Sequence, residues 1–391
     1  MLNSQFSPWP SFTEEEANAV RDVLLSNRVN YWTGTECREF EKEFSNWCGS
    51  EYAVALANGS LALDVAFKAL GLTAGDEVIV TSRTFLASVS SIINTGATPV
   101  FADISRDTQN ITPNTVRAKI TSKTKMILCV HLAGWPCEMD SMMALADEFG
   151  LYIVEDCAQA HGAKYKGKPV GSIGHIGTWS FCQDKIMTTG GEGGMVTTND
   201  RNLWSKMWSY KDHGKSWDSV YERKYPSGFR WVHDSFGTNC RMIEMQAVIG
   251  RIQLKRMNDW TVKRISNLNK IWNTARKLSG LRVSLVPDNI EHAAYKCYVF
   301  VEPDKLKDGW NRDRVMAEIN SLGVPCFSGS CSEVYLEKAF NDTGFRPKQR
   351  LSTAKELGET SLMFLVHPSL TEQEITLTCE AITTVVKKAQ L

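Results

Sequence analysis

One stretch decides how this chain folds: Thr178-Trp-Ser-Phe-Cys-Gln-Asp-Lys185-Ile-Met-Thr-Thr-Gly-Gly-Glu-Gly-Gly-Met-Val196. Its lysine, Lys185, follows a short strand-like run and precedes a glycine-rich turn. Upstream, Tyr152-Ile-Val-Glu-Asp156 has the pattern of a buried strand that ends in two acids. A pyridoxal phosphate (PLP) enzyme needs such a pair, because the lysine forms a Schiff base with the cofactor and the aspartate keeps the pyridine nitrogen protonated. The stretch therefore predicts a PLP site, rather than an exposed lysine before an ordinary glycine turn.

Short apolar runs alternate with helical patterns over residues 52–198. Runs such as Glu77–Val80 and Lys125–Val130 are almost entirely apolar, which is typical of a largely parallel sheet covered on both faces. After Met242 the pattern changes to an α+β composition that begins with a long amphipathic helix. We predict an α/β fold with a large domain over residues 1–250, including an N-terminal helical segment, and a smaller C-terminal α+β domain over residues 251–391.

The composition argues against several classes of protein. Lys plus Arg and Asp plus Glu both number 44, so the chain has no basic excess for binding nucleic acid. No apolar run reaches the length of about 18 residues that a membrane span needs. The N-terminus lacks the basic and apolar regions of a secretion signal. The 11 cysteines form no CxxC pair and favour reduced thiols, so we expect a cytoplasmic protein.

Candidate cofactor contacts lie where other predicted strands end, the edge at which ligands bind in open α/β sheets. Asn58-Gly59-Ser60 precedes a predicted helix, so its amides and the Ser60 hydroxyl can hold a phosphate. Ser180 offers a second hydroxyl. Phe85 either stacks on a flat cofactor ring or lies in the core. Gln159 can donate a hydrogen bond to a ring oxygen.

Two more positions carry polar groups of interest. His161 either orients Asp156 by a hydrogen bond or packs beside it. The segment Gly237-Thr-Asn239-Cys-Arg241-Met242 leads into a helix, so its amide and guanidinium groups are placed for binding anions. We expect no metal site, because the histidines show no ligand spacing such as HExxH.

Taken in order along the chain, the motifs resemble those of the DegT/DnrJ/EryC1/StrS family of PLP-dependent sugar aminotransferases. The resemblance covers nearly the full chain and implies the aspartate aminotransferase-like fold of fold type I PLP enzymes. Its parts are Tyr31-Trp-Thr-Gly34, Ala57-Asn-Gly-Ser60, Val130-His-Leu-Ala-Gly-Trp-Pro136, Glu155-Asp-Cys-Ala-Gln-Ala-His-Gly162, Ser180 to Lys185, Thr188 to Met195, Gly237 to Met242 and Ser361 to Pro368.

The resemblance also assigns roles to residues. Lys185 would carry PLP, and Asp156 would pair with the pyridine nitrogen. Phe85 would stack on the ring, and Gln159 would contact the ring hydroxyl. The phosphate ligands would be Gly59, Ser60, Ser180 and, reaching across from a partner subunit, Asn239. The catalytic unit would therefore be a homodimer.

Two segments depart from the family pattern. The family usually has Thr-Thr-Gly-Glu-Gly-Gly after the lysine, whereas this chain has one more glycine, in Gly190-Gly191. The segment from Cys326 to Tyr335 lacks the proline-rich, histidine-containing version of many members. Our candidate substrate contacts are Trp32, His161, Arg241 and Ser330.

The resemblance implies a ping-pong transamination with pyridoxamine phosphate as the intermediate form of the cofactor. L-Glutamate would donate the amino group, and a nucleotide-linked 4-keto-6-deoxyhexose would accept it. The pathway would be surface-polysaccharide or glycoconjugate biosynthesis, such as O-antigen synthesis for lipopolysaccharide. The alternatives are a sugar 3-aminotransferase, a sugar dehydratase, and a non-catalytic regulatory protein that binds a sugar or PLP. Lys185 argues against a dehydratase, because dehydratase relatives carry histidine at that position.

Overall fold

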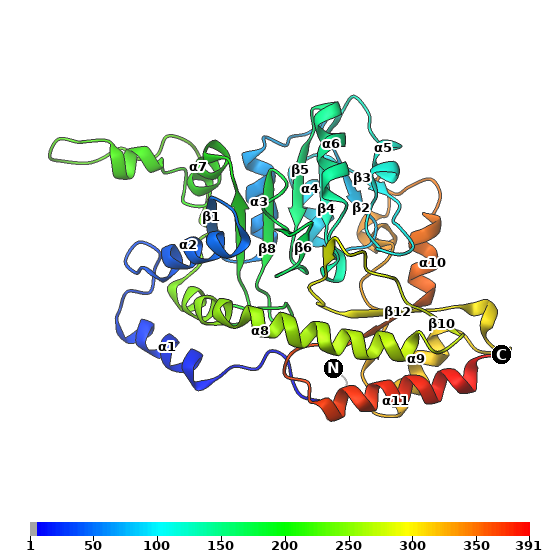
Figure 1. Cartoon of the computed structure of the whole chain (residues 1–391). Helices are drawn as coiled ribbons and strands as arrows, with labels where there is room; N and C mark the ends of the chain where they lie inside the picture. The colour runs from blue at the N-terminus through cyan, green and yellow to red at the C-terminus, as the bar shows by residue number, and fades with distance from the viewer. Residues whose placement is uncertain (1–5) are drawn as a thin grey trace.

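The computed structural model describes residues 6–391 and has a seven-stranded sheet at its centre (Figure 1). The strand order is β1-β9-β8-β5-β4-β2-β3. All neighbours from β8 to β3 are parallel, and β9 is antiparallel to both β8 and β1. The strands are β1 Tyr52–Leu56, β2 Glu77–Thr81, β3 Thr98–Ala102, β4 Thr124–Val130, β5 Tyr152–Asp156, β8 Ile176–Ser180 and β9 Gly194–Thr198. The predicted mostly parallel sheet is confirmed.

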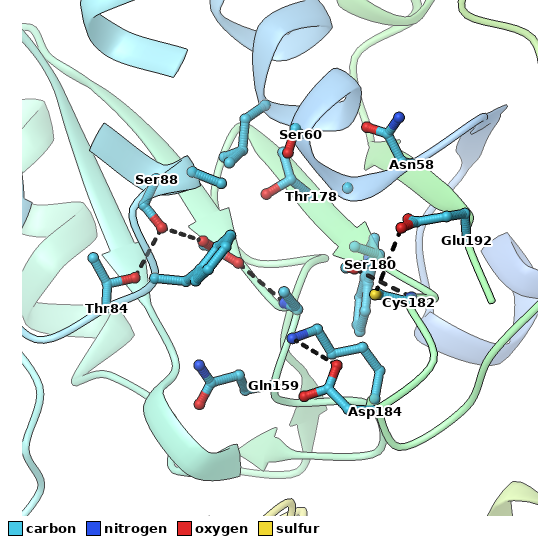
Figure 2. Close-up of a pocket in the computed structure, with 18 residues that line it drawn as sticks. Asn58, Ser60, Thr84, Ser88, Gln159, Thr178, Ser180, Cys182, Asp184 and Glu192 are labelled. Atoms are coloured by element: carbon cyan, nitrogen blue, oxygen red, sulfur yellow. Dashed lines mark hydrogen bonds and ion pairs between the residues drawn. The ribbon is translucent and has the colours of Figure 1, made fainter. Parts of the chain in front are cut away.

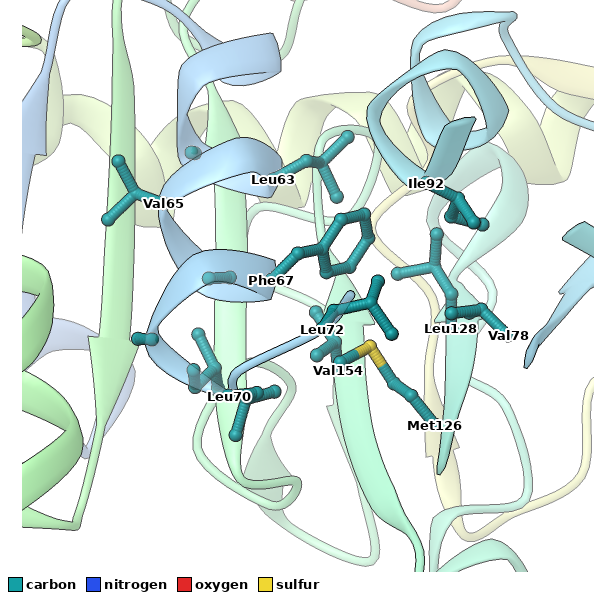
Figure 3. Packing of buried hydrophobic residues seen from close by; sticks show 14 of the residues in the cluster. Leu63, Val65, Phe67, Leu70, Leu72, Val78, Ile92, Met126, Leu128 and Val154 are labelled. Carbon is teal, nitrogen blue, oxygen red and sulfur yellow. The ribbon is translucent and has the colours of Figure 1, made fainter. Parts of the chain in front are cut away.

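Helices cover both faces of this sheet. Met126 and Leu128 of β4 pack with Phe67 and other residues of α3 (Gly59–Ala69) and α4 (Ala87–Asn94), as Figure 3 shows. The alternate residue Ile127 packs on the opposite face with α5 (Pro113–Arg117) and α6 (Met139–Phe149). Successive side chains of a strand point to opposite faces. The strands therefore read as continuous apolar runs, because both faces are buried.

A long helix, α8 (Glu244–Ala275), connects the two halves of the chain and crosses residue 250 without a break. It packs against α1 (Glu14–Leu25), α2 (Glu36–Cys48) and α11 (Glu372–Ala389). In Figure 1, α8 and α11 run side by side along the lower edge of the molecule. The sequence pattern favours a helix over Ile243–Arg256 that continues or bends through Ala275, and the structure has a single element, Glu244–Ala275.

The C-terminal part contains a four-stranded antiparallel sheet in the order β10-β12-β14-β13. A third, three-stranded sheet pairs the C-terminal strand β11 with β6, and β6 with β7. The elements of these sheets and the remaining helices are β6 Lys164–Tyr165, β7 Lys168–Pro169, β10 Leu281–Arg282, β11 Ile290–Glu291, β12 Cys297–Val301, β13 Cys326–Phe327, β14 Ser361–Phe364, α7 Arg201–Tyr210, α9 Arg312–Ser321 and α10 Ser352–Thr360.

Several details differ from the sequence prediction. The sequence pattern favours a helix over Phe85–Asn94, whereas α4 begins at Ala87, so Phe85 lies in the preceding loop. The pattern over Thr112–Lys119 also favours a helix, whereas α5 covers only Pro113–Arg117. The 11 cysteines are free, as predicted. Within residues 6–391, no helix combines the length and the apolar character needed to cross a membrane.

Candidate active site

A cavity of about 490 Å³ lies at the carboxyl ends of the parallel strands (Figure 2). Its walls come from the loops that follow β1, β2, β5 and β8. Such loops meet at one edge of a parallel sheet, so residues far apart in sequence line one pocket. The predicted site residues in this lining are Gly59, Ser60, Phe85, Asp156, Gln159, Ser180 and Lys185.

The N-terminus of α3 forms one side of the pocket. Asn58 caps the helix, since its side-chain oxygen accepts a hydrogen bond from the amide of Leu61 at 2.9 Å. The amides of Gly59 and Ser60 belong to the first turn, where the helix itself provides no acceptors. Gly59 lies so close to Ser180 that a Cβ on it would stand 2.6 Å from Ser180 Cβ. The N-terminus of α3 and the hydroxyls of Ser60 and Ser180 therefore line one pocket, a donor set that fits a phosphate.

Asp156 ends β5, and its carboxylate lines the pocket. Ser88 Oγ donates to its Oδ2 at 2.9 Å, and the amide of Ala158 donates to its Oδ1 at 3.1 Å. Burial raises the pKa of the Asp156 carboxyl, and these hydrogen bonds together with nearby Lys185 offset only part of the rise. A cation beside this carboxylate would favour the ionised form. A protonated pyridine nitrogen is such a cation.

Gln159 and Phe85 are oriented for contact with a flat ring. Oε1 of Gln159 accepts a hydrogen bond from the amide of Ala133 at 2.8 Å, which leaves the side-chain NH2 as a donor for the pocket. The Phe85 side chain lines the pocket and is 72% exposed, so the alternative of a core aromatic is wrong. Its free face suits stacking on an aromatic ring.

Lys185 enters the pocket from the loop after β8. Its Nζ lies 3.6 Å from Oδ1 of Asp184 and 5.5 Å from the centre of the Tyr295 ring. Its backbone carbonyl accepts a hydrogen bond from Nε1 of Trp9 at 2.8 Å. The amine thus shares one cavity with the Asp156 carboxylate, a phosphate-binding helix end and an exposed aromatic face. The residues present therefore fit PLP.

The glycine-rich turn after Lys185 depends on its glycines for conformation. Gly190 and Gly191 have φ angles of 85° and 119°, which residues with side chains rarely adopt. The amide of Gly191 donates to Thr188 Oγ1 at 3.1 Å and closes the turn. This turn accommodates the extra glycine and brings Glu192 into the pocket wall.

The sequence prediction missed several polar residues of the pocket. Most of them flank predicted residues in the loops at the strand ends, where that position was the available signal, whereas Thr178 lies within β8 and Ser88 within α4. They are Thr84, Ser88, Thr178, Cys182, Asp184 and Glu192. Tyr295 had no such signal, because it belongs to the C-terminal half and approaches Lys185 only through tertiary packing.

Asn239 and Arg241 lie outside this cavity, in the segment between α7 and α8. Arg241 Nη1 donates to Oδ1 of buried Asp212 at 2.7 Å. Oδ1 of Asn239 accepts a hydrogen bond from the amide of Arg241 at 3.3 Å. Within one chain, neither side chain belongs to the lining of the PLP-sized pocket.

Trp32 and Ser330 also lie outside the lining. The Trp32 ring packs edge to face against Trp208, with centroids 6.1 Å apart. Ser330 Oγ hydrogen-bonds the hydroxyl of Tyr298 at 3.3 Å. Their role as substrate contacts stays a prediction.

His161 is buried and packs against the rings of Trp179 and Phe181, at centroid distances of 5.2 and 5.6 Å. It makes no hydrogen bond to Asp156, whose partners are Ser88 and Ala158. Of the two alternatives for His161, packing is therefore the one that the structure has. Burial lowers the pKa of His161 to about 3, so its ring is neutral near pH 7.

His131, Glu155 and Cys157 form a buried group of potential metal ligands. The amide of Cys137 donates to Nδ1 of His131 at 3.0 Å, so Nε2 carries the proton and donates to Glu155 at 3.0 Å. Both ring nitrogens are thereby engaged. Glu155 also accepts hydrogen bonds from the amides of residues 171, 173 and 174. This group therefore ties the loop after β7 to β5 and offers no free imidazole lone pair.

Comparison with known proteins gives one consistent result. A model of the DegT/DnrJ/EryC1/StrS aminotransferase family matches residues 10–383. The GDP-perosamine synthase of Escherichia coli O157:H7 is 34% identical over 375 residues, which are 95% of this chain and 96% of that protein.

Two further relatives agree with this match. The dTDP-3-amino-3,4,6-trideoxy-alpha-D-glucose transaminase of Streptomyces venezuelae is 32% identical over 352 residues, which are 90% of this chain and 87% of that protein. The X-ray structure of the aminotransferase from Psychrobacter cryohalolentis is 64% identical, with a TM-score of 0.96 over 98% of this chain and 99% of the other.

Proposed function

This chain belongs to the DegT/DnrJ/EryC1/StrS aminotransferase family, and from this premise we propose that it transfers the amino group of L-glutamate to a nucleotide-linked 4-keto-6-deoxyhexose. The family's enzymes are PLP-dependent, and this chain is a sugar aminotransferase with the fold type I architecture. The observation that carries the proposal is that Lys185 and Asp156 line one cavity, together with the N-terminus of α3.

When bound, PLP supplies an aldehyde that combines with amines and a ring that withdraws electrons. The amides of Gly59 and Ser60, with the Ser180 hydroxyl, would bind its phosphate. Asp156 would keep the ring nitrogen protonated. Once the donor amine has displaced Lys185, Nζ of Lys185 would act as the general base that removes the proton from the donor α-carbon. The same amine would serve as general acid when the keto-sugar accepts the amino group.

The test is to add L-glutamate alone to PLP-loaded protein and to follow the visible absorption band of the cofactor. We expect glutamate to remove the band as 2-oxoglutarate forms, and a keto-sugar acceptor to restore it. Lys185→Ala should abolish both changes. A band that ignores glutamate would contradict the proposed donor. Conversion by Lys185→Ala at the wild-type rate would contradict the role of Lys185.

We further propose that the active unit is a homodimer in which Asn239 reaches the phosphate of the partner subunit. Asn239 lies outside the pocket of its own chain. The segment between α7 and α8 extends away from the body of the molecule (Figure 1). It exposes large apolar side chains, at 75% for Phe229, 74% for Trp231 and 100% for Phe236. Exposed aromatic groups of this kind are typical of a protein–protein interface.

Mixing two inactive variants tests this arrangement. The Lys185→Ala and Asn239→Asp proteins are mixed and allowed to exchange subunits, which gives dimers with one subunit of each variant. If Asn239 acts across the interface, one of the two sites in such a dimer has both native residues. We expect the mixture to regain activity that neither variant has alone. A monomeric protein, or a mixture without regained activity, would contradict the proposal.

The position of amination has a second candidate. The name of the Streptomyces venezuelae relative specifies a 3-amino sugar, which supports a 3-aminotransferase as the alternative. Comparing 3-keto and 4-keto nucleotide sugars as acceptors in the assay above separates the two. A role in O-antigen or other surface-polysaccharide synthesis, the cytoplasmic location and the domain division at residue 250 stay predictions.

A further inference from the structure

Asp184 places a carboxylate directly beside the amine of the proposed cofactor lysine. Its Oδ1 lies 3.6 Å from Nζ of Lys185, and both side chains line the pocket (Figure 2). Within residues 6–391, Asp184 is the only carboxylate within 4 Å of this nitrogen. It is therefore the natural counterion of Lys185.

A residue from the other half of the chain fixes this carboxylate. The hydroxyl of buried Tyr295 donates to Oδ2 of Asp184 at 2.5 Å. The amide of Tyr295 donates to the carbonyl of Ala133 at 3.0 Å, which anchors its backbone beside the large sheet. The two carboxylate oxygens of Asp184 are thus divided between Tyr295 and Lys185.

The other titratable groups near this nitrogen are a carboxyl with its own hydrogen-bond partners, a second lysine that stays mostly protonated near pH 7, a neutral imidazole and a thiol. Asp156 holds its hydrogen bonds to Ser88 and Ala158. Burial lowers the pKa of Lys296 to about 8 and that of His161 to about 3. Burial raises the pKa of the Cys182 thiol and so keeps it protonated. Although burial raises the pKa of Asp184, Lys185 and the Tyr295 hydroxyl outweigh that effect and keep it low. Asp184 is therefore an anion at working pH.

We propose that Asp184, held by Tyr295, is the positioning residue that keeps Nζ of Lys185 at the pocket and sets its affinity for the proton. The proposal rests on the proposed function, in which this nitrogen is linked to PLP and then released as a base. An anion within about 4–6 Å of a nitrogen base stabilises the protonated form of that base. A fixed carboxylate also holds the released Lys185 amine in one position by an ion pair, so that the amine remains within reach of the substrate.

The test uses the PLP-loaded protein and does not depend on turnover. The visible band of bound PLP changes when the lysine-derived nitrogen loses its proton, so a pH titration of absorbance measures the pKa of that nitrogen. We expect Asp184→Asn to lower this pKa by at least about half a unit, since part of the effect is screened at the exposed carboxylate. Tyr295→Phe, which leaves both charges in place, should give a smaller shift in the same direction.

The matched control is Glu192→Gln, which removes the charge of another carboxylate in the loops that line the pocket. Glu192 Oε1 lies 3.8 Å from Sγ of Cys182 and has no ion pair with Lys185. Glu192→Gln should shift the pKa of the PLP-linked nitrogen less than Asp184→Asn does. An unchanged pKa of the PLP-linked nitrogen in Asp184→Asn, or an equal shift of that pKa in Glu192→Gln, would overturn this inference but not the proposed function. A wild-type protein without any PLP band would overturn the proposed function as well.

Discussion

The indole Nε1 of Trp9 donates a hydrogen bond to the backbone carbonyl of Lys185 at 2.8 Å, although the two residues are 176 positions apart. The Trp9 ring also packs against Trp260 and stacks on His367, at centroid distances of 5.1 and 5.9 Å. The N-terminal segment thereby holds the loop that carries the proposed cofactor lysine.

Trp9→Phe keeps an aromatic ring at this position but removes the donor. The loss of one hydrogen bond, worth about 1 kcal/mol, should weaken PLP binding several-fold. Equilibrium dialysis of the cofactor measures this. Trp310→Phe is the control, because Trp310 packs on Arg314 in the C-terminal part, away from the pocket. Equal PLP affinity in Trp9→Phe and the wild type would show that the contact does not position the loop.

Asp156→Asn should separate stability from function. Because burial raises the pKa of Asp156, the cofactor-free fold is less stable at neutral pH than it would be with an uncharged side chain at this position. That cost is absent at low pH and appears as the pH rises through the raised pKa. The cofactor-free variant should therefore melt at a higher temperature than the wild type near pH 7–8, with the difference narrowing toward about pH 4. Transamination should fall by about 100-fold or more. A variant that is less stable at every pH would contradict this account.

Gly59→Ala tests the close approach of α3 to Ser180. An added Cβ would stand 2.6 Å from Ser180 Cβ, so the helix end has to move away from the proposed phosphate site. We expect PLP affinity to fall by about tenfold or more, since each 1.4 kcal/mol changes it tenfold. Gly358 lies in α10, and a Cβ added to it would stand 3.1 Å from Ser332 Cβ, so Gly358→Ala serves as the control for general destabilisation. If both variants retain wild-type PLP affinity, the N-terminus of α3 does not bind the phosphate.

Glu155→Gln tests the buried group beneath the site. Burial raises the pKa of Glu155, but hydrogen bonds from His131 and the amides of Gly171 and Gly174 outweigh this and hold it low. The resulting stability is present above the ordinary glutamate pKa and is lost as the pH falls toward the lowered value. At pH 7 the variant should lose about 3 kcal/mol in urea unfolding.

That loss should shrink below about pH 4, where the wild type itself loses the contribution of the carboxylate. Glu148→Gln, which breaks an exposed pair with Arg117, should change stability little at any pH. A loss in Glu155→Gln no larger than that in Glu148→Gln would contradict the structural role of this group.

The sequence predicted those parts of the fold and site that depend on local pattern. The strands of the large sheet are buried on both faces, so their apolar runs are visible in the sequence. Lys185, Asp156 and the Gly59–Ser60 turn each sit at the end of such a run, and a parallel sheet gathers those ends at one edge. For the same reason, the predicted pocket contacts came mainly from these loops.

The parts that were missed depend on long-range packing. Trp9 and Tyr295 approach Lys185 from distant parts of the chain, one before it and one after it in sequence, and neither stands in a motif. Two-residue strands such as β6 and β11 pair only because tertiary structure brings them together, so they have no periodicity to detect. The sequence analysis also missed helix α7, although its N-terminus had a local signal. Asp200 caps this helix by accepting hydrogen bonds from the amides of Asn202 and Leu203.

The central claim is that Lys185 carries the cofactor, and the most direct test is to find which lysine does so. Borohydride reduction of the PLP-loaded protein converts the imine to a stable amine, and mass spectrometry of the digested protein locates it. We expect the phosphopyridoxyl group on the peptide that contains Lys185. The nearest competitor is Lys296, whose Nζ lies 4.9 Å from the centre of the Tyr295 ring and whose pKa burial lowers to about 8. An adduct on Lys296, with Lys185 unmodified, would contradict the account.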